Sequence, residues 1–151
     1  NLKFDGINKS KKVYDQIYQV GKENSIFFQF DKITITPNSF ASHKLLALAF
    51  KANKQNQVIE TLFFSYFIEG KNIGNKTVLN NIAKQHGIFN NKTSNYLFSN
   101  EDKENLINEE YYAKALGIRG VPCFIINKEF VLYGAQDKKN FINIFDSIIN
   151  V

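Results

Sequence analysis

Residues 116–126 read Leu116-Gly117-Ile118-Arg119-Gly120-Val121-Pro122-Cys123-Phe124-Ile125-Ile126, so that an expected helix end runs through Gly-Val-Pro directly into a β-like apolar run. Proline donates no N–H to a sheet ladder and is confined to strand starts, edges and bulges. A proline that opens a buried strand therefore predicts a special backbone conformation, namely a cis Val121–Pro122 peptide bond.

The residues that follow this segment predict a hairpin and a closing helix. Two short β runs, Cys123–Ile126 and Phe130–Tyr133, flank Asn127-Lys128-Glu129, which has the length of a hairpin turn. Beyond Gly134-Ala135-Gln136-Asp137, apolar residues recur on one face of a final helix, at Phe141, Ile144, Phe145 and Ile148.

The residues that precede the segment predict a block of helices. Apolar spacing of three and four indicates helices at residues 10–23, 39–52, 55–68, 75–84 and 101–116. Ser10 and Asn75 are expected N-caps, and Gly87 and Gly117 are expected C-terminal glycines. Between the helices, residues 26–30 are expected to be extended and residues 93–98 to form a short turn.

The helix expected at residues 55–68 carries an aromatic stripe, made of Val58, Leu62, Phe63, Tyr66 and Phe67. Such a stripe usually faces a neighbouring helix. We therefore interpret it as core rather than as an aromatic ligand site.

Length and composition are typical of one globular domain. The 151 residues are 44% hydrophobic, which is enough to bury a core. No run approaches about 18 uncharged apolar residues and no signal peptide is visible, so no membrane partner is expected. We expect a cytoplasmic location, with the periplasm as the alternative because the chain starts with Asn1 rather than Met.

The net charge of +5 invites a nucleic-acid interpretation, because basic surfaces attract phosphate. However, the basic residues are spread along the chain, and Arg119 is the single arginine among 19 of them. We therefore expect no nucleic-acid partner.

Cysteine and histidine are too sparse for several kinds of site. Cys123 is the one cysteine, which excludes an intrachain disulfide framework and a cysteine-rich zinc site. His43 and His86 lie far apart without ligand spacing, so no metal site is expected. The residues themselves also call for no resident cofactor.

Four motifs in a fixed order give the chain a resemblance to a known family. They are Thr36-Pro37-Asn38-Ser39 with His43, Tyr66-Phe67-Ile68-Glu69-Gly70-Lys71-Asn72-Ile73-Gly74, Leu116-Gly117-Ile118-Arg119-Gly120-Val121-Pro122, and Gly134-Ala135-Gln136. From about Ser10 onward the chain resembles DsbA-like thioredoxin-fold proteins of the FrnE type. Relatives of this type include 2-hydroxychromene-2-carboxylate isomerases and kappa-class glutathione transferases.

The resemblance implies an α/β fold, in the form of an incomplete thioredoxin-like fold in a single domain over residues 1–151. A helical insertion would occupy about residues 38–117, and a β-hairpin and C-terminal helix would occupy residues 118–151. The family's N-terminal strand, Cys-x-x-Cys helix and second strand have no counterpart here. The hairpin would then keep an unpaired edge that favours association. We expect a fragment of a longer protein, and the alternative is a native form completed by another subunit, as in a homodimer.

The loop before the hairpin carries the first candidate site residues. The resemblance implies that Val121 and Pro122 bind substrate, with the backbone N–H and C=O of Val121 pairing with an extended chain. The alternative is that Pro122 only shapes the entry to the strand. Cys123 is the catalytic candidate, and its alternative is a small buried hydrophobic residue.

The remaining candidates come from two other motifs. Ala135 and Gln136 correspond to a segment that binds the γ-glutamyl end of glutathione in glutathione-using relatives, next to a helix N-terminus that favours carboxylates. Helix capping alone is the alternative. By resemblance, Asn38 and His43 border the active-site groove. Their alternatives are an N-cap for Asn38 and a buried structural imidazole for His43.

The resemblance implies a thiol-disulfide oxidoreductase of DsbA/FrnE type, of which this chain is the substrate-binding half without the Cys-x-x-Cys. Its partners would be protein thiols and disulfides, or glutathione, and the chain alone is expected to be inactive. One alternative is a glutathione-dependent isomerase or transferase, in which Ser replaces the reactive Cys. Another is a non-catalytic peptide-binding module, which the lack of a cysteine pair also fits.

Overall fold

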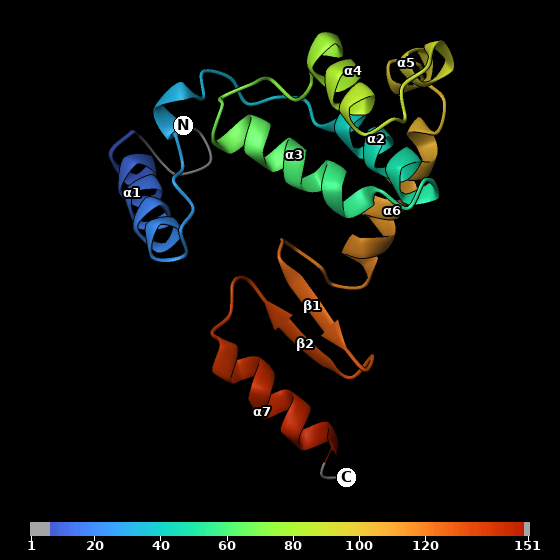
Figure 1. The fold of residues 1–151 in the computed structure, drawn as a ribbon. Helices are drawn as coiled ribbons and strands as arrows, with labels where there is room; N and C mark the ends of the chain where they lie inside the picture. Colours follow the sequence, from blue (N-terminus) through green and yellow to red (C-terminus); the bar gives the residue numbers. More distant parts are fainter. Residues whose placement is uncertain (1–6, 150–151) are drawn as a thin grey trace. The chain divides into compact units, whose positions relative to one another are not determined.

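The computed structural model describes residues 7–149, and these fold as two compact units that divide between Asn100 and Glu101 (Figure 1). The described part of the first unit consists of α1 (Ile7–Glu23), the 3-10 turn η2 (Phe30–Lys32), α2 (Phe40–Lys51), α3 (Gln55–Phe67), α4 (Lys76–Gln85) and α5 (Asn91–Leu97). The second consists of α6 (Lys103–Ala115), β1 (Cys123–Ile126), β2 (Phe130–Tyr133) and α7 (Lys138–Ile149). Helices followed by a hairpin and a helix is the order that the sequence predicts.

The core of the first unit is built around α2, which contacts α3, α4 and α5. Apolar side chains from all four helices meet there and are almost fully withdrawn from solvent: Ala41, Leu45, Ala49, Val58, Leu62, Leu79, Ile82, Ala83 and Leu97. Close packing of this kind fixes neighbouring helices relative to one another. The core therefore gives α3 and α4, which also contact each other, a defined spacing.

Two predicted caps of α4 are confirmed. The Asn75 side chain accepts hydrogen bonds from the backbone N–H groups of Thr77 at 2.8 Å and Val78 at 3.3 Å. At the other end Gly87 has φ +66°, and its N–H donates to the carbonyl of Lys84 at 3.0 Å.

A lysine lies inside the helical core. Lys44 has an exposed fraction of 0%, and its Nζ donates to the carbonyl oxygens of Tyr96 and Ser99 and lies 4.1 Å from the centre of the Tyr96 ring. A buried cation needs such partners. Lys44 therefore ties α2 to the end of α5, a link that the sequence pattern did not predict.

Three local predictions are wrong. Helix α1 begins at Ile7, so Ser10 lies inside the helix and does not cap it. Residues 26–30 were expected to be extended, but Phe30 begins the 3-10 turn η2 and residues 26–29 form no strand; there the Gln29 N–H donates to the Phe67 carbonyl at 2.9 Å, and the Phe28 ring stacks on Phe30 at 5.1 Å. Residues 93–98 belong mostly to α5, whose N-cap Asn90 accepts from the Thr93 N–H at 2.8 Å.

The second unit contains the predicted hairpin. Strands β1 and β2 pair antiparallel, with Cys123 opposite Tyr133 and Ile126 opposite Phe130. The turn residues Asn127 and Lys128 both have positive φ, as in the turns that match strand twist. Helix α7 follows the hairpin in the chain (Figure 1), and its Phe141 ring meets the Phe124 ring of β1 edge-on, with the ring centres 4.9 Å apart.

No helix in residues 7–149 is long and apolar enough to cross a bilayer.

Candidate functional site

Helix α6 ends in a Schellman motif directly before residues 118–122, where the candidate site lies. Gly117 has φ +82°, its N–H donates to the Lys114 carbonyl at 2.9 Å, and the Ile118 N–H donates to the Ala113 carbonyl at 3.1 Å. A side chain at position 117 would be strained at this φ. The glycine therefore turns the chain sharply from α6 into residues 118–122.

Val121 stands out from the surface at the entry to the hairpin. It is 90% exposed, and within the described residues its backbone makes no hydrogen bond. The Val121–Pro122 peptide bond is cis. The carbonyl of the next residue, Pro122, accepts from the Gly134 N–H at 2.8 Å. The ladder therefore ends at Pro122, and the donor and acceptor of Val121 are open to a ligand.

A pocket of about 630 Å³ adjoins Val121. Its lining residues all belong to the second unit: Gly117, Arg119, Gly120, Val121, Tyr133 and Gly134. At Gly120 a Cβ atom would meet nothing within 4 Å, and φ lies outside the left-handed region. Packing within the described chain therefore does not require glycine here, and its missing side chain leaves room beside the Val121 backbone.

Cys123 lies directly after this loop, as the first residue of β1. It is a free thiol of intermediate exposure, opposite Tyr133 in the hairpin. A chain with one cysteine cannot form an internal disulfide. A disulfide of this thiol would need a sulfur from another molecule or from outside these 151 residues.

Ala135 and Gln136 lie between β2 and α7. The Gln136 side chain donates to the Tyr133 carbonyl at 2.6 Å and accepts from the Asn140 amide at 2.8 Å. The Asp137 carboxylate accepts from the Lys139 N–H at 2.8 Å, so it caps the start of α7. Ala135 is exposed beside them, and ligand contact by Ala135 and Gln136 stays a prediction.

Asn38 and His43 lie in the first unit, around the start of α2. The N-cap position of α2 is Ser39 rather than Asn38, but the Asn38 side chain accepts from the Phe40 N–H at 3.0 Å, and the motif glycine Gly74 packs against the Asn38 backbone. His43 is exposed, so it is not a buried structural imidazole. The loop residues Val121, Pro122 and Cys123 are brought together with Ala135 and Gln136 in one unit, and Asn38 with His43 in the other.

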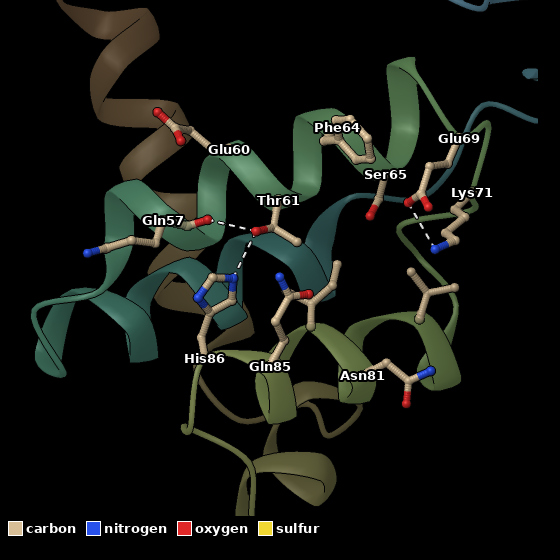
Figure 2. Close-up of a pocket in the computed structure, with 12 residues that line it drawn as sticks. Gln57, Glu60, Thr61, Phe64, Ser65, Glu69, Lys71, Asn81, Gln85 and His86 are labelled. Carbon is tan, nitrogen blue, oxygen red and sulfur yellow. Dashed lines mark hydrogen bonds and ion pairs between the residues drawn. The ribbon is translucent and has the colours of Figure 1, made fainter.

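A second pocket of about 590 Å³ lies in the first unit between α3 and α4 (Figure 2). Thr61 and Ser65 from α3 face Gln85, the last residue of α4, and His86, which follows it, across the pocket. Within residues 7–149 no group of three His, Cys, Asp or Glu side chains is placed to hold a metal ion, in this pocket or elsewhere.

A model of the DsbA-like thioredoxin domain matches residues 3–145 of the chain. The chain belongs to this family. The α/β fold class predicted from the sequence is thereby confirmed, with its helical insertion before a hairpin and a C-terminal helix. A search of curated proteins finds no match to this DsbA-like chain.

Sequence reasoning missed two features of this DsbA-like domain. Arg119 was noted as the sole arginine but not as a wall of the pocket beside Val121. The polar pocket between α3 and α4 was not predicted either, because its residues are of ordinary polar types and Thr61 lies 25 positions before His86. Of these two features, only the first could have been predicted from the sequence, because Arg119 is the one arginine and directly precedes the Gly-Val-Pro motif.

Proposed function

We propose that this chain docks the substrate of a thiol-disulfide oxidoreductase of FrnE type. The observation that carries the proposal is Val121, a 90% exposed residue with open backbone groups at the end of the hairpin ladder. Family membership supports the redox chemistry. An extended substrate would pair with the N–H and C=O of Val121 as a short additional strand.

The redox step needs a cysteine pair, and these 151 residues hold one cysteine. In the proposed reaction a thiolate of a pair outside these residues attacks a sulfur of the docked substrate's disulfide. The substrate S–S bond breaks, a mixed S–S bond forms, and the second substrate sulfur leaves as a thiolate. The chain as given contributes docking, so dithiol-dependent reductase activity from it alone would overturn this assignment of roles.

Arg119 gives the docking pocket a preference in charge. Arg119 is exposed, and it lines the same pocket as Gly120, Val121 and Tyr133. Guanidinium groups form strong, charge-assisted hydrogen bonds with carboxylates. Substrates with Asp or Glu near the docked segment are therefore favoured over neutral and basic ones.

The test measures the binding of extended peptides to the chain by calorimetry. In these peptides Ser replaces the Cys of the substrate. Gly120→Val should weaken binding at least about tenfold, because its side chain fills the space beside Val121, while the chain stays folded. Asn143→Val, which adds the same side chain on exposed α7, is the control and should bind normally. Equal affinities of the two variants would refute docking at Val121.

Arg119→Gln tests the charge preference separately. It should remove the advantage of an acidic peptide over its neutral counterpart and leave the affinity for the neutral peptide unchanged. Lys139→Gln, which removes a cation outside the pocket, should keep the preference. An acidic preference that survives Arg119→Gln would assign it to other charges.

The runner-up function is a glutathione-dependent isomerase or transferase. The observation in its favour is the same pocket, because glutathione is a short peptide with two carboxylates and would also meet both Val121 and Arg119. Titration with glutathione and with the extended peptides decides between the two. Saturable glutathione binding without peptide binding would favour the glutathione enzyme.

A further inference from the structure

The polar pocket between α3 and α4 is a separate place from the docking loop, and it belongs entirely to the helical unit. Its volume of about 590 Å³ lies within the range of small-molecule sites. Figure 2 shows the side chains of Thr61, Ser65, Gln85 and His86 gathered around it. Phe64, Val78 and Ile82 are also among its lining residues. The pocket therefore combines polar walls with an apolar part.

Ser65 is the residue that points to a ligand. Its exposed fraction is 4%, yet within the described part of the chain its hydroxyl has no hydrogen-bond partner. A helical serine or threonine normally satisfies its hydroxyl on the carbonyl four residues earlier, as Thr61 does on Gln57 at 2.9 Å. In Figure 2 the Ser65 oxygen points away from α3 into the pocket. The Ser65 oxygen is not sealed from solvent, so water satisfies it in the free protein, and a ligand hydroxyl in the pocket would take the place of that water.

Thr61 and His86 form a hydrogen bond that orients the imidazole ring at another part of the pocket lining. The Thr61 hydroxyl gives its hydrogen to the Gln57 carbonyl, so it accepts at 2.8 Å from Nε2–H of His86. The neutral His86 ring then carries its proton on Nε2 and keeps Nδ1 as an acceptor. The imidazole is thus held in one tautomer at the pocket wall (Figure 2).

The charges of the lining restrict the chemical class of the ligand. Two carboxylates, Glu60 and Glu69, line the pocket against one ammonium, and that ammonium of Lys71 is paired with Glu69 at 2.9 Å. An anion would meet an unpaired negative charge and no free cation here. The other polar groups are hydroxyls and amides, which both donate and accept.

We propose that this pocket binds a small neutral ligand rich in hydroxyl groups, the chemistry of a sugar ring. Its hydroxyls would pair with Ser65, the amide of Gln85 and a carboxylate of the rim. The C–H face of the ring would lie against the apolar side chains, among them Phe64. The proposal is independent of the docking loop and of the redox function.

The experiment is a titration of the isotope-labelled full chain with glucose, mannose and N-acetylglucosamine, followed by backbone amide shifts. At least one sugar should give saturable shifts at Thr61, Ser65 and Gln85. Ser65→Ala should weaken that binding about three- to tenfold, the value of one hydrogen bond. Ser94→Ala, the same change at a buried serine of α5 outside the pocket, should leave the affinity unchanged.

Inorganic phosphate and spermidine complete the panel as an anion and a cation. Saturation by either of them without saturation by any sugar would overturn the ligand class. No saturable shift with any probe would overturn the site itself. An affinity for sugar that Ser65→Ala leaves unchanged would also refute the proposal, because the unpartnered hydroxyl would then play no part in binding.

Discussion

The two units of this chain use their apolar residues in opposite ways. In the helical unit nine apolar side chains are at most 8% exposed and form one core. In the second unit none of the described side chains from Glu101 to Ile149 is buried, and Val121, Ile125 and Ile149 are 90%, 49% and 77% exposed. A two-stranded hairpin is marginally stable on its own. The first unit is therefore held by packing, whereas the second leaves apolar side chains and the Val121 backbone exposed.

The largest expected effect separates the two units directly. Leu45→Ala should lower the free energy of unfolding by about 2–5 kcal/mol, because Leu45 is 0% exposed and its loss leaves a cavity. Ile149→Ala, in a residue that is 77% exposed, should change it by less than about 0.5 kcal/mol. Urea unfolding followed by circular dichroism measures both. Equal losses of unfolding free energy would show that α7, like the core around Leu45, is buried in solution.

Two glycines sharpen the comparison. Gly70 has φ +69°, and a Cβ there would collide with the Lys32 carbonyl, so Gly70→Ala should cost about 2 kcal/mol or more. Gly120→Ala meets nothing within 4 Å and should be neutral or stabilise by up to about 1 kcal/mol. Thermal unfolding of the two variants is the measurement. A destabilising Gly120→Ala would mean that position 120 serves the fold rather than a ligand.

A smaller contrast concerns two serines within the helical unit. Ser42 and Ser65 are both 4% exposed, but only the Ser42 hydroxyl has a partner, the Ile73 carbonyl at 2.7 Å. Ser42→Ala should cost about 1–3 kcal/mol because it orphans that carbonyl, whereas Ser65→Ala should be neutral or slightly stabilising. Chemical unfolding measures the pair. A loss at Ser65 equal to that at Ser42 would assign Ser65 a structural role and remove the argument for a ligand beside it.

The sequence predicted the parts of the fold that depend on neighbouring residues. Asn75, Gly87 and Gly117 act at helix ends through bonds to residues two to five positions away, so their roles could be read locally. The hairpin was predictable for the same reason. Residues 26–30 were not, since apolar alternation cannot tell a strand from a loop that packs aromatic rings on Phe67.

Burial and the second pocket were beyond sequence reasoning, because both depend on tertiary packing. The stripe of α3 was expected to be core, and Val58 and Leu62 are indeed buried, but Phe63 is 55% exposed. Periodicity gives the apolar face of a helix but not how much of it a neighbour covers. In the same way, nothing in the spacing of Thr61 and His86 indicates that α3 and α4 bring them within 2.8 Å.

The smallest expected effect is a pH dependence confined to the helical unit. Burial raises the pKa of the Tyr66 phenol above its ordinary value of 10.0, and the nearby Tyr14 raises it further. The unfolded chain therefore loses this proton at a lower pH than the folded chain does, so stability present below about pH 10 is lost as the pH rises through the folded pKa. Tyr66→Phe should flatten the decline in melting temperature between about pH 9 and 11. Tyr111→Phe, at a phenol that is 68% exposed in the second unit, should leave the decline as it is. Because lysines titrate in the same interval in every variant, the difference between the two curves isolates Tyr66, and parallel curves would show that its phenol is as free to ionise in the fold as in the unfolded chain.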